Sequence, residues 1–406
     1  MDLVWIVIIL FAAGFLGSRF AFAKERLPAL LRDMFLTGWE YIFIGMVLGP
    51  LGFDLIDQGR MEQLSPLLAL GLAWAGLIFG MQMRVADLKK VDRGLLKLTL
   101  FQMGATFAAL FGLTLVMGMM GRSFTLSELF AGAGVVAAAG AISSPTTLSM
   151  MASFYPRTSA PLFRRLLTVA TLDVGPALVA VGLVFCLFPA GQGGTFDPAR
   201  GATLLFFSVL IALAMAGIFR YFGRKRLKPE EELTVLLGFL AFLSGVALFL
   251  KLSPLFLALM VGVTLANTLE RDDPVFTTLF ATEKPFYLIL LILTGLLWSP
   301  SGPLAFFMAL AVALARFWAK GTSVRIGTRL FRPEGGLPDD AGLGLMAQGA
   351  LALAIGVNYL IVYPGEASRL VFGVIALMVI LNEVVAPFLI RRVADREAAG
   401  RKGGEG

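Results

Sequence analysis

The sequence predicts an all-α polytopic membrane protein with about thirteen transmembrane helices. Three observations support this fold class. Of the 406 residues, 58% are hydrophobic and only 15% are charged, too few for the surface of a soluble protein of this length. Apolar blocks of about 18–25 residues recur along the whole chain, and each is long enough to cross ~30 Å of hydrocarbon. The basic residues gather in alternate loops, as expected for loops on one side of a membrane.

The predicted spans are nearly uncharged apolar blocks bounded by charged residues, glycine or proline. The first, 3–20, resembles the core of a signal peptide, but basic residues follow it instead of a small-residue cleavage site, which indicates a retained helix. The other spans are 37–56, 64–83, 96–119, 126–151, 163–188, 202–221, 233–250, 253–269, 285–299, 303–323, 340–362 and 368–390.

The distribution of Lys and Arg predicts the orientation. Of 34 such residues, 27 lie in alternate loops and the C-terminal tail, five lie in the remaining loops and two lie inside a span. Cytoplasmic loops carry the excess of basic residues, so the N-terminus is predicted outside and the C-terminus inside, in a bacterial cytoplasmic membrane. The net charge of +7 therefore reflects topology and predicts no nucleic-acid partner. The tail 394–406 is short, charged and glycine-rich, which predicts disorder.

Composition also excludes several kinds of catalytic site. The chain has no histidine, so it cannot form an HExxH zinc site or a Ser-His-Asp triad. Cys186 is the single cysteine, which excludes an intrachain disulfide. No phosphate-binding GxxxxGK pattern is present, and the spans hold no convincing pair of acids. The sequence therefore predicts a protein that is not an enzyme and uses no cofactor.

A few charged residues lie at membrane depth, where a charge is costly and usually marks an ion path. They are Asp173, Arg316, Lys320 and, nearer the end of its span, Glu383. Asp173 follows Arg165 by roughly 12 Å of helix, and Lys320 precedes Arg332 by roughly 18 Å. Asp173 and Lys320 can therefore meet at similar depth, and Arg316 is the alternative partner of Asp173. Asp173 and its partner form either an ion-binding pair, which we favour, or a purely structural ion pair.

The motif GAISSPTTLSMM interrupts the fifth span. Pro145 donates no backbone hydrogen bond and drives Ser144 out of helical angles, which leaves bare carbonyls at membrane depth. Hydroxyl groups gather at the same point, on Ser143, Ser144, Thr146 and Thr147. Irregular backbone survives there only when protein buries it or when it lines a cavity. The alternative is an ordinary proline kink whose hydroxyls bond to the helix.

Two further stretches predict helix breaks. Gly175 and Pro176 closely follow Asp173, which predicts a break and a cavity beside the acid. In GLGLMAQGALALAIG of the twelfth span, Gln348 is polar in mid-span and Gly349 weakens the helix next to it. The fifth and twelfth spans lie seven spans apart and so run in opposite directions. Paired broken helices in inverted halves are typical of secondary transporters.

Several segments resemble the monovalent cation:proton antiporter superfamily, the sodium or potassium/proton exchangers with a Kef-like or NhaP-like membrane domain. GWEYIFIGMVLGPLGFDLID and GLAWAGLIFGMQM are similar to its second and third helices, and GAISSPTT to its crossover. LSPLFLALMVGVTLANT, AQGALALAI and LNEVVAPFLIRR resemble later helices. The segments occur in the family's order over nearly the whole chain. The resemblance implies inverted repeats with two crossed broken helices.

The resemblance also implies a residue for each part of an ion site. The family's ion-binding aspartate corresponds to Asp173, which a cation and a proton would share. Leu172 stands where the family usually has Asp, Asn or Gln, and Ser144 where one branch has Asp. The basic residue of a late core helix corresponds best to Lys320, with Arg316 one turn earlier on the same face. The other cation ligands expected at the crossing are Ser143, Ser144, Thr147 and Gln348.

By the same resemblance, the spans divide into two domains and a linker. Spans 4–6 and 11–13 would form the ion-translocating core, while spans 1–3 and 8–10 would form the scaffold of a homodimer. The implied ranges are 1–92 and 229–300 for the scaffold, 93–190 and 301–393 for the core, 191–228 for the linker and 394–406 for the tail.

The expected function is exchange of Na⁺ or K⁺ for protons across the bilayer by alternating access, with a role in pH homeostasis. Two other functions stay open. Asp173 could be the selectivity charge of a cation channel, or Arg316 and Lys320 could bind the substrate of an ion-coupled organic-anion symporter. Because Leu172 replaces a second acid, Asp173 offers one negative charge, which predicts one-for-one, electroneutral exchange.

Overall fold

The computed structural model describes residues 38, 40–49, 52–53, 58–120, 124–155, 160–189, 195–222, 229–270, 273–299 and 302–403. Within these residues the regular structure is helical and no strand occurs. Eight helical segments among the described residues are long and apolar enough to cross a membrane, with α7 and α8 counted as one, and shorter apolar helices accompany them. This confirms an all-α polytopic membrane protein.

The helices coincide with twelve of the thirteen predicted spans, while span 3–20 lies outside the described residues. Their bounds are α3 Glu40–Leu48, α4 Gln58–Met81, α5 Val85–Leu88, α6 Arg93–Met120, α7 Leu126–Ala141, α8 Pro145–Ala152, α9 Ala160–Leu187, α10 Pro198–Phe222, α11 Pro229–Phe249, α12 Pro254–Thr268, α13 Pro274–Ala281, α14 Glu283–Leu297, α15 Gly302–Phe331, η4 Ala341–Leu345, α16 Gly349–Val362 and α17 Glu366–Gly403.

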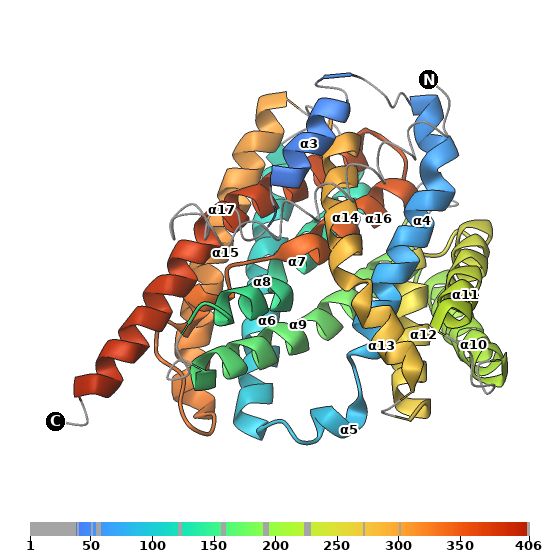
Figure 1. The fold of residues 1–406 in the computed structure, drawn as a ribbon. Coiled ribbons are helices and arrows are strands. Elements are labelled where there is room, and N and C mark those ends of the chain that lie inside the picture. The colour runs from blue at the N-terminus through green and yellow to red at the C-terminus, as the bar shows by residue number, and fades with distance from the viewer. Residues whose placement is uncertain are drawn as a thin grey trace.

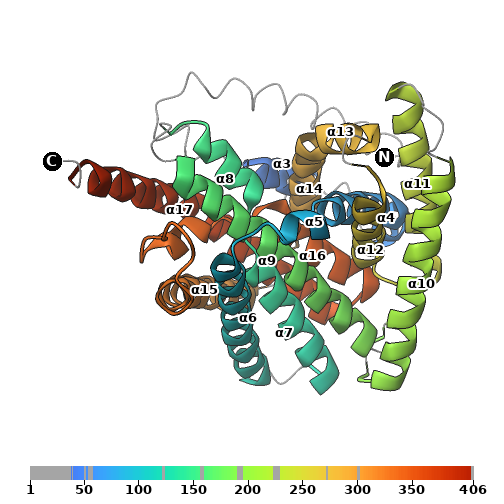
Figure 2. The same ribbon diagram turned by 90° about the horizontal axis from the view of Figure 1, so that it is seen from below.

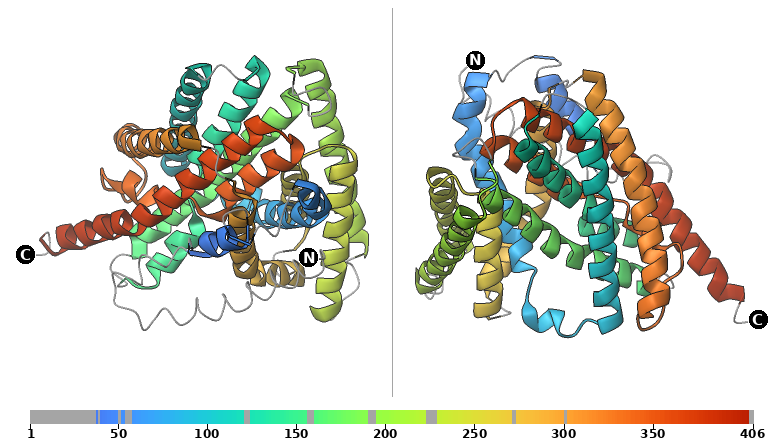
Figure 3. Two further views of the ribbon diagram at one scale, coloured as in Figure 1. Left: turned by 90° about the horizontal axis from the view of Figure 1, so that it is seen from above. Right: turned by 180° about the vertical axis from the view of Figure 1, so that it is seen from behind.

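The helices gather on the two sides of α9, which crosses the middle of the bundle. In the view from below, α6, α7 and α15 lie on one side of α9, and α4 and α12 lie on the other (Figure 2). α10 and α11 form the outer edge beyond α12 (Figures 1 and 2). The views from above and behind show the same order, with α6 and α15 side by side (Figure 3). The central position of α9 places Asp173 inside the protein.

The contact between α4 and α12 depends on two glycines. A Cβ atom on Gly80 would lie 2.4 Å from Leu259 O and 2.8 Å from Gly262 Cα. A Cβ atom on Gly262 would lie 2.6 Å from Leu77 O. Side chains are excluded at both positions, so the two backbones touch, as small residues allow in membrane helix pairs. α4 and α12 therefore form a closely packed pair, the α4–α12 unit, beside α9.

The predicted break after Asp173 is wrong, because α9 is continuous from Ala160 to Leu187 with Pro176 inside it. A proline removes one hydrogen bond, and neighbouring helices can hold the helix together around it. Gly175 lies against the flexible end of Met83, and a Cβ atom there would lie 2.9 Å from Met83 Cε.

The tail is also different from the prediction of disorder, since α17 continues to Gly403 and extends away from the bundle (Figure 1). Val393 and Ala394 are buried, and Arg396 Nη1 lies 3.0 Å from Asp340 Oδ2. These contacts stabilise the helix beyond the apolar span. Residues 404–406 of the predicted tail lie outside the described residues.

Candidate functional site

The fifth predicted span is broken between α7 and α8, as the Ser-Ser-Pro motif predicts. α7 ends at Ala141, and the extended backbone of Ile142 leads to Ser144, the N-cap of α8. Pro145 is the first residue of α8, where its missing N–H costs no helical hydrogen bond. The Ser144 hydroxyl accepts a 3.2 Å hydrogen bond from Thr147 N and so satisfies one free donor of the half-helix.

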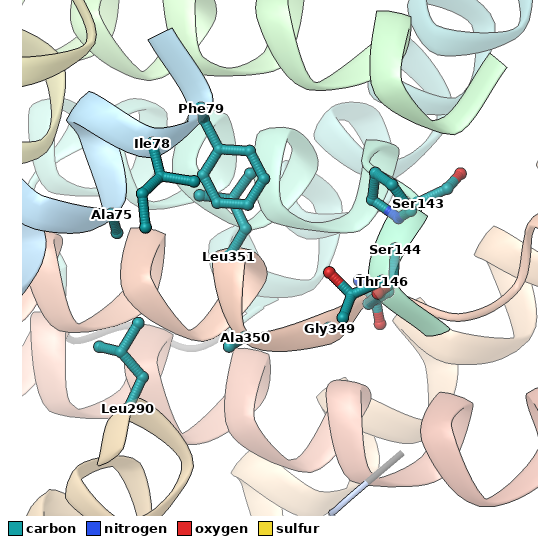
Figure 4. Close-up of a pocket in the computed structure, with 12 residues that line it drawn as sticks. Ala75, Ile78, Phe79, Ser143, Ser144, Thr146, Leu290, Gly349, Ala350 and Leu351 are labelled. Carbon is teal, nitrogen blue, oxygen red and sulfur yellow. The ribbon is translucent and has the colours of Figure 1, made fainter. Parts of the chain in front are cut away.

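The twelfth predicted span is broken as well, between η4 and α16. Gly349 opens α16 with a φ of +70°, a conformation that favours glycine. The two broken spans touch, because Ser144 N donates a 2.8 Å hydrogen bond to Ala347 O. Figure 4 shows Ser144 and Thr146 next to Gly349. The half-helices α8 and α16 therefore begin at one crossing.

Asp173 lies on α9 against the first break and is fully buried. Its Oδ1 accepts a 3.1 Å hydrogen bond from Ser143 N. Its Oδ2 accepts a 2.7 Å bond from Ser143 Oγ, a 3.3 Å bond from Lys320 Nζ and a 3.4 Å bond from Gln102 Nε2. The carboxylate thus receives one backbone donor and three side-chain donors, and the side-chain donors can turn away from it.

Lys320 is the cationic partner of Asp173, and both side chains are fully buried. Its Nζ also donates to Ala141 O at 2.7 Å and to Ser143 Oγ at 2.6 Å. Ser143 Oγ accepts from Lys320 and donates to Asp173, so a continuous chain of hydrogen bonds joins the ammonium to the carboxylate. The expected contact between Asp173 and Lys320 is present.

Arg316 occupies a different place, at the C-terminal ends of the helices that precede the two breaks. Its guanidinium donates to Gly140 O at 2.6 Å and Ile142 O at 2.9 Å, and to Met346 O at 2.7 Å and Leu345 O at 3.2 Å. Free carbonyls at helix C-termini carry partial negative charge, which a guanidinium balances. Arg316 therefore joins the two broken spans, while Lys320 contacts Asp173.

Glu383 on α17 balances the partial positive charge at the N-terminus of α16, on the other side of the second break. Its Oε1 accepts from Gln348 N at 2.8 Å and from Gly349 N at 2.7 Å. These are free donors at the N-terminus of α16, where partial positive charge favours a carboxylate. Each end at the crossing thus meets a buried side chain of opposite sign.

The other predicted ligands bond within the crossing instead of to Asp173. Thr147 Oγ1 donates to Ser144 Oγ at 3.0 Å. Gln348 Nε2 donates to Ala139 O at 2.9 Å, and Gln348 Oε1 accepts from Asn382 Nδ2 at 2.8 Å. Of the predicted hydroxyl and amide ligands, Ser143 is the one whose hydrogen bonds reach the carboxylate.

Two polar residues of the site were not predicted from the sequence, and a third was predicted without its role. Gln102 contacts Asp173 and Asn382 donates to Gln348, while Glu383, already noted as a charge at membrane depth, accepts from the first residues of α16. Gln102 and Asn382 are polar residues inside apolar spans, which was the available signal. The role of Glu383 could not be read without knowing that α17 passes the second break.

Two cavities approach the crossing. One of ≈600 Å³ lies among the loop after α4, α8 and α9, and reaches Leu172 beside Asp173. The other, of ≈40 Å³, lies between α4, α14 and the two breaks, with Ser143, Ser144 and Gln348 in its wall (Figure 4). The larger cavity extends along α9 as far as Thr171 and Leu172, while Asp173 itself is fully buried.

Two crossed broken helices around a buried carboxylate and its ammonium partner define the class of protein as a secondary transporter. Such an arrangement offers ion ligands from backbone and side chains at membrane depth.

A family model described as "Sodium/hydrogen exchanger, transmembrane" matches residues 39–395, and the chain belongs to this family. The match confirms the resemblance to the monovalent cation:proton antiporter superfamily. The fold is similar to that of the sodium proton antiporter MjNhaP1 from Methanocaldococcus jannaschii, whose structure was determined at pH 8. That similarity has a TM-score of 0.64 and 16% sequence identity, and covers 97% of this chain and 100% of the other. No curated protein sequence matches the chain significantly.

Proposed function

We propose that the protein exchanges Na⁺ or K⁺ for protons by alternating access, with Asp173 as the site that cation and proton share. The observation that carries the proposal is the buried contact of Asp173 with Lys320 and Ser143 at the crossing. A lone carboxylate at membrane depth holds either a proton or a cation, and one excludes the other. If the protein changes conformation only when the site is filled, the two ions are exchanged.

Lys320 acts as the internal substitute for the cation. While Asp173 is ionised and holds no cation, the ammonium neutralises it, which keeps a single charge out of the low-dielectric interior. An entering cation takes the place of the ammonium, and Ser143 Oγ and Ala141 O, which now accept from Lys320, become free oxygen ligands. Ser144, Thr147 and Gln348 frame this set with further neutral oxygens.

The ≈600 Å³ cavity is the proposed route from one side of the membrane. The charge pattern of the loops supports a cytoplasmic position for its mouth, because Arg84 and Arg164 lie in its wall. In the proposed arrangement the N-terminus is outside and the C-terminus is cytoplasmic, and the protein is a homodimer in a bacterial cytoplasmic membrane, where it serves pH homeostasis.

The proposed moving parts are a core and a scaffold, and the α4–α12 unit belongs to the scaffold. The core comprises 93–190 and 301–393, which hold both breaks and all the buried charges described above. The scaffold comprises 1–92 and 229–300, with 191–228 as linker. Movement of the core against the scaffold would expose Asp173 to the two sides in turn.

The geometry weighs against an organic-anion symporter. Such a protein needs a cationic side chain free to bind the substrate carboxylate. Arg316 already donates to four carbonyl oxygens, and Lys320 contacts Asp173.

A cation channel differs from an exchanger in its source of free energy. A channel cannot drive a cation against the gradient of that cation, whereas an exchanger can.

The purified protein in proteoliposomes with an internal pH dye tests the proposal. Each alkali cation is added in turn, with an imposed pH gradient as the driving force. Uphill uptake of Na⁺ or K⁺ coupled to proton movement supports exchange. Cation movement that only follows its own gradient supports a channel, and proton uptake that depends on an organic acid supports the symporter.

A further inference from the structure

Gln102 is a polar residue of the ion site whose hydrogen bonding is incomplete. It lies on α6, and its side chain is fully buried. Nε2 lies 3.4 Å from Asp173 Oδ2, a long contact, while Oε1 has no hydrogen-bond partner. A buried acceptor left without a donor costs free energy, so its retention calls for an explanation.

The orientation of the amide follows from the chemistry of its neighbour. An ionised carboxylate only accepts hydrogen bonds, so Nε2 must face Asp173 and Oε1 must face away. Thr99, on the same buried face of α6, shows the ordinary alternative. Its hydroxyl donates to Leu95 O at 2.8 Å, as helical threonines commonly do. Thr106 and Thr114, farther along the same face, also have a hydroxyl oxygen without a partner. Among these unmatched oxygens, that of Gln102 belongs to the side chain that contacts Asp173.

We propose that Gln102 is a ligand of the transported cation and that its Oε1 completes the oxygen set around Asp173. This inference rests on the proposed function. In the cation-free state the amide gives Nε2 to the carboxylate, as observed. When a cation replaces Lys320 at Asp173, rotation of the terminal amide exchanges Nε2 for Oε1 with little change in volume.

An amide suits this position better than a charged side chain. It offers a donor to the bare carboxylate and an acceptor to the cation, so it serves both states of the cycle. It adds no charge, so the loaded site keeps the one-for-one balance set by Asp173. Alkali cations in proteins are bound largely by neutral oxygens that replace their water shell. Gln102 Oε1 joins Asp173, Ser143 Oγ and Ala141 O in such a set.

The competing role is that of a positioning residue, in which Gln102 acts only through Nε2 on Asp173. The two roles differ at high pH. A positioning residue alters how readily Asp173 exchanges its proton, and this effect disappears once the carboxylate is fully ionised. A ligand still sets the affinity for the cation under that condition.

The test compares Gln102→Met with Thr99→Val in proteoliposomes. Methionine keeps the length and nearly the volume of glutamine without its polar atoms, and Thr99→Val removes a hydroxyl that is already satisfied. At a pH where the native KM for the cation no longer changes, Gln102→Met is expected to raise that KM about tenfold. Thr99→Val is expected to leave it unchanged. An unchanged KM in folded Gln102→Met overturns the ligand role.

A direct measurement on the native protein covers the case in which Gln102→Met does not fold. Tl⁺ replaces alkali cations and is located by its anomalous scattering in crystals grown at high pH. Tl⁺ in coordination contact with both Asp173 and Gln102 Oε1 supports the proposal, and Tl⁺ at Asp173 without Gln102 overturns it. Failure of the proposed function looks different, because the native protein and Thr99→Val would then show no coupled exchange.

Discussion

The two half-helices that begin at the crossing are held in different ways. At the start of α8, Asp173 accepts one backbone N–H, from Ser143, and three side-chain donors. At the start of α16, Glu383 Oε1 accepts two backbone N–H groups at 2.8 and 2.7 Å. Asp173 lies in the sixth predicted span and Glu383 in the thirteenth, and these two spans are counterparts in the predicted inverted halves. The same device, an acid at a helix N-terminus, therefore occurs twice with different partners.

The difference indicates which of the two acids can change its partners during a transport cycle. Backbone donors cannot leave Glu383 unless α16 unwinds, so that carboxylate is fixed. The donors on Asp173 are mostly side chains that can rotate, and one of them, Lys320, carries the charge that a cation would replace. We infer that Glu383 stabilises the crossing and that Asp173 exchanges its partners.

The largest expected effect comes from Asp173→Asn. The amide keeps the shape of the side chain but can neither ionise nor release a proton, so coupled exchange should be abolished. The protein should still insert and purify as a monodisperse species. The measurement is cation movement driven by a pH gradient in proteoliposomes. Normal driven movement in this variant would refute Asp173 as the shared site.

Arg316→Lys should act on stability rather than on ion affinity. Lysine keeps the charge but lacks the planar guanidinium, which donates to carbonyl groups at the ends of both α7 and η4. We expect a loss of about 3 kcal/mol in the free energy of unfolding, since several charge-assisted hydrogen bonds are broken. Thermal unfolding in detergent measures this loss. A stable variant with a raised cation KM would instead place Arg316 in the ion site.

Glu383→Gln tests the comparison of the two acids at the start of α16. The amide can still accept from the backbone, but the charge that balances the N-terminus of α16 is gone. We expect a loss of about 1–2 kcal/mol of stability and an unchanged KM for the cation. Thermal unfolding and exchange assays are read on the same preparation. Loss of exchange in a fully stable protein would show that both acids take part in transport.

Much of this crossing could be predicted from the sequence, because its signals are local. Proline at 145 and glycine at 349 act on their own backbone, so both breaks were predicted at the right residues. The same local rule failed at Pro176, where packing around α9 keeps the helix continuous. The partners of Asp173 were harder to predict from the sequence. Depth in the membrane favoured Lys320 and left Arg316 as the alternative, whereas the contact of Gln102 follows only from the packing of α6 against α9.

The placement of Arg316 shows the limit of the same reasoning. It lies one turn before Lys320 and on the same face of α15, so the sequence could not decide which of the two meets Asp173. The choice depends on where the carbonyl ends of two other spans lie. Those positions come from tertiary packing, which no local pattern contains.

The smallest expected effect concerns the membrane potential. Asp173 offers one negative charge, and Leu172 stands where a second acid would be, so the site holds one proton or one monovalent cation. Exchange by the native protein should therefore be electroneutral. The rate is measured in vesicles whose potential is clamped with valinomycin, and it should not change with that potential.

Gln102→Glu supplies the matched positive control for this measurement. The substitution places a second carboxylate beside Asp173 with almost no change in shape. Two protons would then be exchanged for one monovalent cation, so one charge would cross in each cycle. A potential of 100 mV would shift such an exchange by about 2.3 kcal/mol. If the native protein responds to potential as this variant does, Lys320 must release a proton in each cycle, and the single charge of Asp173 does not set the stoichiometry.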